Sequence, residues 1–140
     1  MPRADFYLIS RPRFREEPLR LVCELARKAH DANLWTLVLA RDAAQAEALD
    51  GMLWDMGEEV YIAHQVAGDD EDDLTPVLIA PPEVHAPLRP LVINLRDAAV
   101  EGSFERVLEV VPADDSARGP LRERWKQYKA RGLEVNKYDM

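Results

Sequence analysis

One segment near the C-terminal end combines positive charges with an aromatic plane. Residues 121–129 read Leu-Arg-Glu-Arg-Trp-Lys-Gln-Tyr-Lys. Side chains three and four positions apart lie on the same side of a helix, so a helix here carries its cations in one stripe with the tryptophan beside it. The stripe consists of Arg118, Arg122, Lys126 and Lys129, and the tryptophan is Trp125. Arginine holds carboxylates through paired hydrogen bonds and tryptophan offers apolar area, so the segment suits a partner that is both anionic and hydrophobic.

Three interpretations of this segment remain open from the residues alone. A short peptide with acidic residues, a hydrophobic end and a free C-terminal carboxylate satisfies both the cations and the ring. Single-stranded nucleic acid offers the same chemistry through its phosphates and stacked bases. The third interpretation is purely structural: an amphipathic helix docks Trp125 into its own protein core, with Leu121 and Tyr128 also facing the body.

Charge is distributed unevenly along the chain. The whole sequence carries a net charge of −8, but residues 116–137 contain seven basic and two acidic side chains. A basic C-terminal element on an acidic body indicates either a localised anionic partner or a solvated helix face rich in arginine. The acidic body argues against a general nucleic-acid-binding protein, because like charges repel phosphates over about a Debye length, roughly 8–10 Å.

The residue patterns that support catalysis or cofactor binding do not occur in this sequence. Its six glycines are Gly51, Gly57, Gly68, Gly102, Gly119 and Gly132. Their spacing forms no phosphate-binding loop, although nucleotide binding through another kind of loop stays open as an alternative. His30, His64 and His85 each lack a second ligand three or four positions away, so no metal site is expected. We therefore predict no catalytic site, no cofactor and no metal.

Apolar periodicity predicts the elements that position these residues. Strands are expected at residues 4–10, 35–40, 60–66, 77–80, 91–95 and 104–111. Helices are expected from Pro18 to about residue 30, from the N-cap Asp42 to Gly57, and from residues 116–120 to Arg131, where Gly132 ends the helix. Strands alternate with helices in the first half, whereas strands in the second half follow too closely for helical crossovers. The pattern predicts one α/β domain over residues 1–140, with a mixed, largely parallel sheet.

The presence of a single cysteine, Cys23, is typical of a protein in a reducing cellular compartment. One cysteine excludes an intrachain disulfide, and this one lies on the apolar side of a predicted helix, where it is expected in the core rather than as a nucleophile. No signal peptide pattern precedes the first strand, and no apolar run is long enough for a membrane-spanning helix. We expect a cytoplasmic protein without membrane contact.

Short sequence blocks spread over nearly the whole chain resemble a known family in their order and spacing. They begin with Phe6-Tyr7-Leu8 and Leu21-Val22-Cys23-Glu24-Leu25-Ala26, followed by Gln45-Ala46, Leu49-Asp50, Leu53-Trp54, His64, Ala67-Gly68, Pro76-Val77 and Ile93-Asn94-Leu95. The most specific block is Arg122-Glu123-Arg124-Trp125-Lys126-Gln127-Tyr128, followed by Gly132 and Asn136. With these blocks the chain resembles the chi subunit family of bacterial DNA polymerase III. The resemblance implies a Rossmann-like three-layer fold without nucleotide chemistry, in a non-catalytic accessory subunit for DNA replication.

The resemblance implies a site for the acidic, Phe-terminated C-terminal tail of single-stranded DNA-binding protein. The family forms this site with its basic C-terminal helix. The matching positions in this sequence are Arg122, Trp125 and Lys126, with Arg118 and Val111 at the edge. Trp125 stands where the family pattern has a tyrosine, which keeps an aromatic face. Gly119-Pro120 departs from the pattern and leaves the role of Arg118 open, because proline lacks an N–H and shifts the start of a helix.

The resemblance also implies a second surface, which binds the psi subunit and thereby links the chain to the clamp loader. The matching segment runs from Trp54 to His64, with Trp54 and Tyr61 as its aromatic anchors. Ordinary core packing of the two rings is the alternative. In some members a similar surface binds an XPD-like helicase. DNA is then contacted only indirectly, through these partner proteins.

Overall fold

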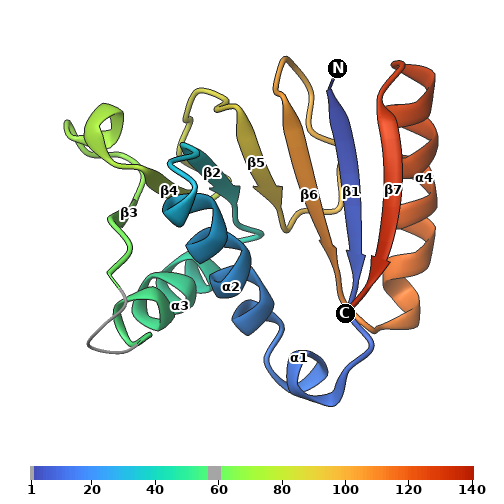
Figure 1. Ribbon diagram of the computed structural model, residues 1–140, viewed down its shortest axis with the longest axis horizontal. Coiled ribbons are helices and arrows are strands. Elements are labelled where there is room, and N and C mark those ends of the chain that lie inside the picture. The colour runs from blue at the N-terminus through green and yellow to red at the C-terminus, as the bar shows by residue number, and fades with distance from the viewer. Residues whose placement is uncertain (1, 57–60) are drawn as a thin grey trace.

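The computed structural model describes residues 2–56 and 61–140, which form a seven-stranded sheet flanked by helices (Figure 1). The strands are β1 (Arg3–Leu8), β2 (Thr36–Leu39), β3 (His64–Val66), β4 (Val77–Ala80), β5 (Leu91–Asn94), β6 (Arg106–Val111) and β7 (Glu134–Asp139). The helices are α1 (Pro12–Glu16), α2 (Pro18–Asp31), α3 (Ala43–Trp54) and α4 (Arg118–Ala130). The strand order across the sheet is β3-β4-β2-β5-β6-β1-β7, so β3 and β7 are its two edges.

All strand pairings in these residues are parallel. The sheet is therefore not mixed, and that part of the predicted fold was wrong. The close spacing of the later strands excluded helical crossovers but not irregular ones. Residues 81–90 and 95–105 return the chain to the start of the next strand without an α-helix, which keeps β5 and β6 parallel to their neighbours.

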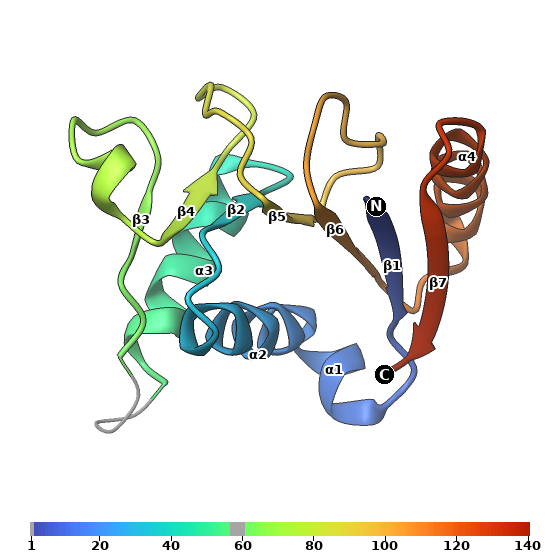
Figure 2. The same ribbon diagram turned by 45° about the horizontal axis from the view of Figure 1, so that its top comes forward.

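Helices cover the two faces of the sheet unequally (Figure 2). Side chains of α1, α2 and α3, among them Phe14, Val22 and Leu49, pack with one face in the larger core cluster. On the other face α4 packs Tyr128 edge-on against Phe6 of β1, with ring centroids 6.1 Å apart. The part of that face over β2 and β4 contacts the irregular segment 81–90 instead. The three-layer α/β architecture expected from the sequence is confirmed.

Local sequence signals set the helix ends. Pro18 occupies the first turn of α2, where a missing N–H removes no helical hydrogen bond. Asp42 caps α3, because its Oδ1 accepts a hydrogen bond from the Gln45 N–H at 2.7 Å. Gly132 follows α4 with a φ of +85°, a left-handed conformation that glycine adopts without side-chain strain. Gly57, expected to end the second helix, lies outside the described residues.

Among the α-helices and strands of the described residues, two have no counterpart in the prediction. The short helix α1 precedes α2, and the edge strand β7 follows α4 and pairs in parallel with β1. The third strand is also shorter than expected: β3 begins at His64, and the predicted start, Val60, lies outside the described residues. The addition of β7 matters for function, because this strand places side chains beside α4.

Candidate functional site

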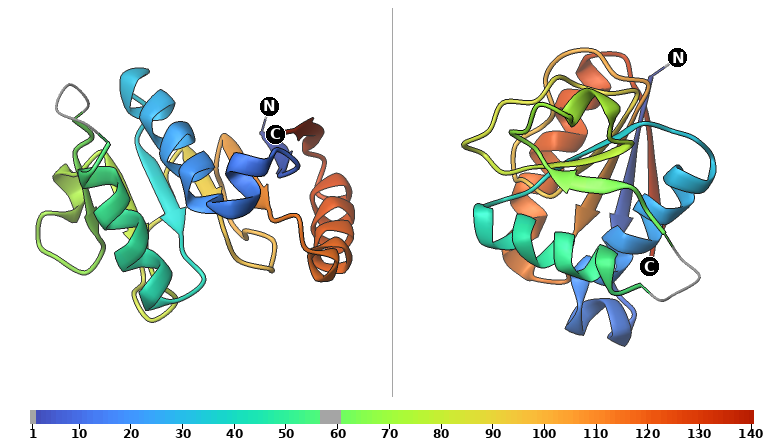
Figure 3. Two further views of the ribbon diagram at one scale, coloured as in Figure 1. Left: turned by 90° about the horizontal axis from the view of Figure 1, so that it is seen from below. Right: turned by 90° about the vertical axis from the view of Figure 1, so that its left-hand side faces the viewer.

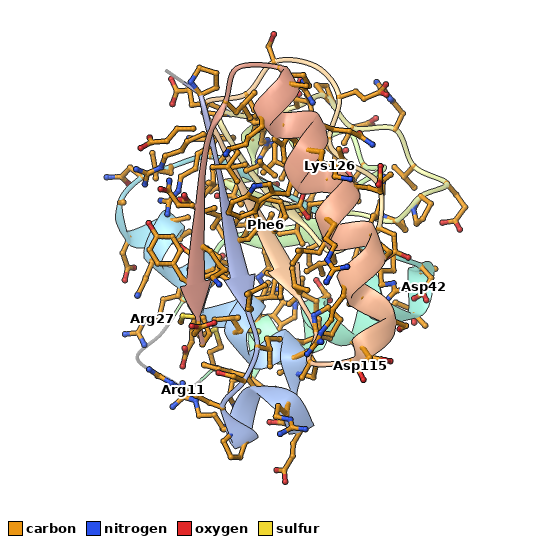
Figure 4. The ribbon with its side chains drawn as sticks, turned by 90° about the vertical axis from the view of Figure 1, so that its right-hand side faces the viewer. Phe6, Arg11, Arg27, Asp42, Asp115 and Lys126 are labelled. Atoms are coloured by element: carbon orange, nitrogen blue, oxygen red, sulfur yellow. The ribbon has the colours of Figure 1, made fainter. Side chains whose placement is uncertain are left out.

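A groove runs between α4 and the edge strand β7 (Figure 4). Its cavity has a volume of about 490 Å³. The apolar lining consists of Phe6, Leu8, Leu121 and Trp125, and the cations at the cavity are Arg122, Lys126 and Lys137. The lining comes from β1, α4 and β7, so the hollow forms only when these three elements pack together. A mostly apolar hollow with a few charged groups accepts an apolar side chain that carries or adjoins negative charge.

A second cavity, of about 530 Å³, adjoins the first. The two cavities share Leu8, Leu121, Arg122 and Lys137. Further cations of the second cavity are Arg15 from α1 and Arg118 from α4, and Val111 at the end of β6 adds apolar surface. Its lining also contains the carboxylate of Asp114, which accepts a hydrogen bond from the Ser116 N–H at 3.0 Å. The shared cations place positive charge where the two cavities meet.

Trp125 contacts the core with part of its ring. The ring centroid lies 5.2 Å from that of Phe6, and the two planes are tilted by 44°. Tyr128, on the next turn, is fully buried, whereas Trp125 is only partly buried and lines the groove. The structural interpretation of the helix therefore holds for Tyr128, while Trp125 both packs on Phe6 and leaves apolar surface open in the groove.

The cations of α4 differ in how they are engaged. Arg118 Nη2 lies 3.6 Å from Asp115 Oδ1, and Lys126 Nζ lies 3.9 Å from Glu123 Oε1. All four of these side chains are exposed, and such pairs contribute about 0–1 kcal/mol, so a ligand can displace them. Within the described part of the chain, the exposed Arg122 has no ion-pair partner. Arg122 is therefore available to an external carboxylate without loss of an existing ion pair.

A buried polar network fixes α4 against the sheet. Glu109 on β6 is fully buried and accepts hydrogen bonds from Tyr128 Oη at 2.6 Å and Asn94 Nδ2 at 2.9 Å. Arg124 Nε lies 2.9 Å from the other carboxylate oxygen, and Arg124 Nη1 donates to the Asp97 carbonyl at 2.8 Å. Burial raises the pKa of Glu109, while Arg124 and the hydrogen-bond donors oppose that shift. The network fixes the rotation of α4 and thereby decides which residues face the groove.

All five residues predicted for the tail site lie around the two cavities. Trp125 and Lys126 line the first, Arg118 and Val111 line the second, and Arg122 lines both. Pro120 does not interrupt α4, because it lies in the first turn, where backbone N–H groups have no helical acceptor. Lys129, which the helical stripe grouped with these cations, lines neither cavity.

Sequence reasoning missed the wall of the groove opposite α4. Phe6 and Leu8 belong to β1, Lys137 to β7 and Arg15 to α1. The basic segment at residues 116–137 includes Lys137. Because the edge strand was not predicted, the sequence did not indicate which residues Lys137 lies beside. The pairing of β7 with β1 was the missing information, because it brings Lys137 into register with Phe6.

Trp54, at the end of α3, and Tyr61, just before β3, form an exposed aromatic pair. These two elements lie at the opposite end of the sheet from α4 and β7 (Figure 3). The two side chains are 61% and 69% exposed, and their ring centroids are 6.5 Å apart. The Trp54 ring also lies 4.9 Å from the ring of His64, a buried side chain whose Nε2 is 3.1 Å from the Asp50 carbonyl oxygen. Core packing, the alternative for both aromatic residues, is therefore wrong for this chain. Large exposed rings side by side are typical of protein interfaces.

A protein side chain occupies the carboxyl ends of two central strands. The carboxyl ends of strands are a common ligand position in α/β sheets. At the ends of β2 and β4, Arg96 Nε donates to the Ala40 carbonyl and Arg96 Nη2 donates to the Ala80 carbonyl, both at 2.8 Å. Across residues 2–56 and 61–140, no three His, Cys, Asp or Glu side chains are grouped to hold a metal ion. Within the same ranges, every helix is too short or too polar to cross a membrane.

Cys23 is expected to react slowly with thiol reagents. It is 4% exposed, and burial raises the pKa of its thiol to about 11, with Glu24 adding to the shift. Relative to an unburied thiol, the thiolate fraction at pH 8 falls by about a hundredfold, and the thiolate is the reactive form. Labelling with a chromogenic disulfide in native buffer and in denaturant compares the two states. Equal rates would contradict the buried position of Cys23.

Comparison with known proteins places these features in a family. The family model described as "DNA polymerase III chi subunit, HolC" matches residues 1–136. The chain is 34% identical to DNA polymerase III subunit chi of Pseudomonas aeruginosa over 94% of this chain and 92% of that protein. It is 32% identical to DNA polymerase III subunit chi of Escherichia coli over 84% of this chain and 82% of that protein.

A solved structure supports the fold independently of sequence. The crystal structure of T4 UvsW superposes with a TM-score of 0.65 at 10% identity, covering 99% of this chain and 41% of that one. At this identity the likeness concerns the α/β fold alone. The match of the family model over nearly the whole chain, with relatives above 30% identity, is decisive: the chain belongs to the DNA polymerase III chi subunit family.

Proposed function

We propose that the chain is a non-catalytic adaptor of bacterial DNA replication. One surface binds the acidic C-terminal tail of single-stranded DNA-binding protein, and the other binds the psi subunit and thereby the clamp loader. The proposal rests mainly on the groove beside α4. This groove combines an apolar cavity with exposed cations, and one of them, Arg122, lines both cavities. This combination matches a peptide that ends in a hydrophobic residue with a free carboxylate and has acidic residues before it.

The groove suggests how such a tail binds. Its terminal Phe ring enters the apolar cavity beside Trp125 and Phe6, where it gains buried apolar area and ring–ring contact. The terminal carboxylate meets Arg122 or Lys126, and upstream aspartates meet the remaining cations, including Arg118. Arg118 and Lys126 exchange their weak pairs with Asp115 and Glu123 for the tail, which makes the upstream contacts sensitive to salt.

Calorimetric titration with a synthetic tail tests the proposal. The probe is a short aspartate-rich peptide that ends in Phe with a free carboxylate, and its control is the same composition with the Phe moved to the interior. We expect saturable one-to-one binding of the probe and weaker binding of the control, because only the probe can place ring and carboxylate together. A single-stranded oligonucleotide that binds more tightly than the probe would favour direct nucleic-acid recognition and contradict the adaptor function.

The second part of the proposal concerns the surface around Trp54 and Tyr61. Both side chains are exposed, and they belong to the end of α3 and the segment before β3. The elements α3 and β3 lie at the opposite end of the sheet from α4 and β7 (Figure 3). Psi, or an XPD-like helicase that uses a similar surface, then binds without blocking the groove. An adaptor needs this separation, since both partners are bound at once.

Tyr61→Ala is expected to weaken association with the psi-side partner while the fold stays intact. Truncation of an aromatic anchor costs about 2 kcal/mol, or roughly thirtyfold in affinity, and Tyr61 is 69% exposed in the free chain. Tyr138→Ala is the matched control, because it removes the same side chain from an exposed position on the opposite edge strand. Surface plasmon resonance with immobilised psi measures both variants. Equal affinity losses, or a large fall in melting temperature for Tyr61→Ala alone, would contradict the interface role.

A further inference from the structure

Lys137 faces the groove from the side opposite α4. Its strand, β7, pairs with β1 so that Lys137 is in register with Phe6, whose ring contacts Trp125. Successive residues of a strand point to opposite faces of the sheet. Asn136 donates to Asp5 on one face, whereas Lys137 lines the groove on the face that α4 covers. The strand thus directs one cation toward the tail site.

Arg122 and Lys137 are the two cations that line both cavities of the groove. One comes from the helix and the other from the edge strand, with Leu8 and Leu121 as the apolar residues that the cavities also share. Lys137 is exposed and, in the described parts of the chain, has no ion-pair partner. Two exposed cations on opposite walls both attract an anion that lies between them, and this attraction offsets their mutual repulsion.

From this arrangement we propose that Lys137 is the second cation of the terminal-carboxylate site and closes on the ligand from the wall opposite Arg122. The inference rests on the proposed function, because it concerns the same acidic tail. A carboxylate has two oxygens with about four lone-pair positions, so it accepts from the arginine fork and from the lysine ammonium together. Neither cation has to give up a partner when the tail binds.

The placement of the carboxylate also gives the tail a direction. The terminal ring occupies the cavity beside Trp125, and its carboxylate lies at the junction, between Arg122 and Lys137. The upstream residues then run along the second cavity, where Arg15 and Arg118 provide the next positive charges. The helix, the edge strand and α1 each contribute to recognition, so the site is wider than the basic helix alone.

Titration of Lys137→Gln with the free-acid tail peptide and with its C-terminal amide tests the inference. The variant should bind the free-acid peptide about tenfold more weakly than the unaltered protein does, since a charge-assisted contact is lost. The amide should show little difference between the two proteins. Lys129→Gln is the matched control, because it removes the same charge from an exposed position of α4 that lines neither cavity, and its affinity should stay within about twofold.

The outcomes separate this inference from the proposed function. If Lys137→Gln and Lys129→Gln weaken binding equally, or if Lys137→Gln affects the free acid and the amide alike, Lys137 acts only through general charge and the inference fails while tail binding stands. If the unaltered protein does not bind the peptide, both fail. Lys137→Arg keeps the charge and should restore most of the affinity, which shows that a loss in Lys137→Gln does not come from a damaged β7; no recovery would contradict the role of the charge.

Discussion

Arg124→Ala is expected to lower the free energy of unfolding by about 3–5 kcal/mol, because removal of one partner leaves a buried charge uncompensated. Arg124 is 4% exposed and its Nε lies 2.9 Å from a carboxylate oxygen of the fully buried Glu109. The same side chain also donates to the Asp97 carbonyl, which loses that hydrogen bond. Urea denaturation followed by tryptophan fluorescence measures the change.

The stability lost in Arg124→Ala should depend on pH through the protonation of Glu109. Burial raises the pKa of Glu109, and loss of Arg124 removes a group that opposes the shift. A raised pKa means that the folded state holds the proton more tightly than the unfolded chain does, so stability falls as pH rises above the ordinary glutamate range. The deficit of Arg124→Ala should therefore be larger at neutral pH than in mild acid.

Arg122→Ala is the matched control on the same helix. Arg122 is exposed, so its removal should change stability by no more than about 0.5 kcal/mol. A similar loss for Arg122→Ala and Arg124→Ala would show that the buried network does not hold α4. Replacing Arg124 and Glu109 together by apolar residues of similar size should recover much of the stability, since no unpaired charge remains.

Arg122→Ala is expected instead to weaken binding of the tail peptide by about one to two decades. A charge-assisted hydrogen bond contributes roughly 1.5–3 kcal/mol, and Arg122 lines both cavities of the groove. Titration calorimetry with the free-acid peptide measures the loss. Lys129→Ala, a charge removal on α4 away from the cavities, should cost far less.

Ionic strength should weaken the charged contacts of the tail more than its apolar contact. Arg118 and Lys126 are exposed, so their contacts with the tail contribute about 0–1 kcal/mol each and weaken as ionic strength rises. The Phe contact is apolar and persists. Binding should therefore fall with salt but not vanish, whereas complete loss at moderate salt would mean that the tail is held by charge alone.

The parts of the fold that sequence predicted well carry strong local signals. The strand at residues 77–80 has the predicted bounds, because a short apolar run stops at two prolines. Asp42 caps α3 as expected, since the carboxylate and the Gln45 N–H are three residues apart. The helical period and the family resemblance together also selected Arg118, Arg122, Trp125 and Lys126, which line the cavities, whereas Leu121 was expected to face the body and Lys129 of the same stripe lines neither cavity.

The parts that sequence could not predict depend on long-range packing. Strand β7 alternates polar and apolar residues weakly, and its partner β1 lies at the other end of the chain. The residues of β1 and β7 that line the groove opposite α4, including Lys137, were therefore not predicted. The all-parallel sheet was missed for a related reason, since only the folded chain shows that residues 81–90 and 95–105 cross back without helices.

The most direct test of the tail-binding groove is a calorimetric cycle that combines Arg122→Ala with amidation of the peptide's C-terminus. If Arg122 binds the terminal carboxylate, each change alone should weaken binding by about one to two decades. The two changes together should cost clearly less than the sum of their separate losses, because both remove the same contact. Silent amidation, or losses that simply add, would contradict a carboxylate site at Arg122 even if the peptide binds elsewhere on α4.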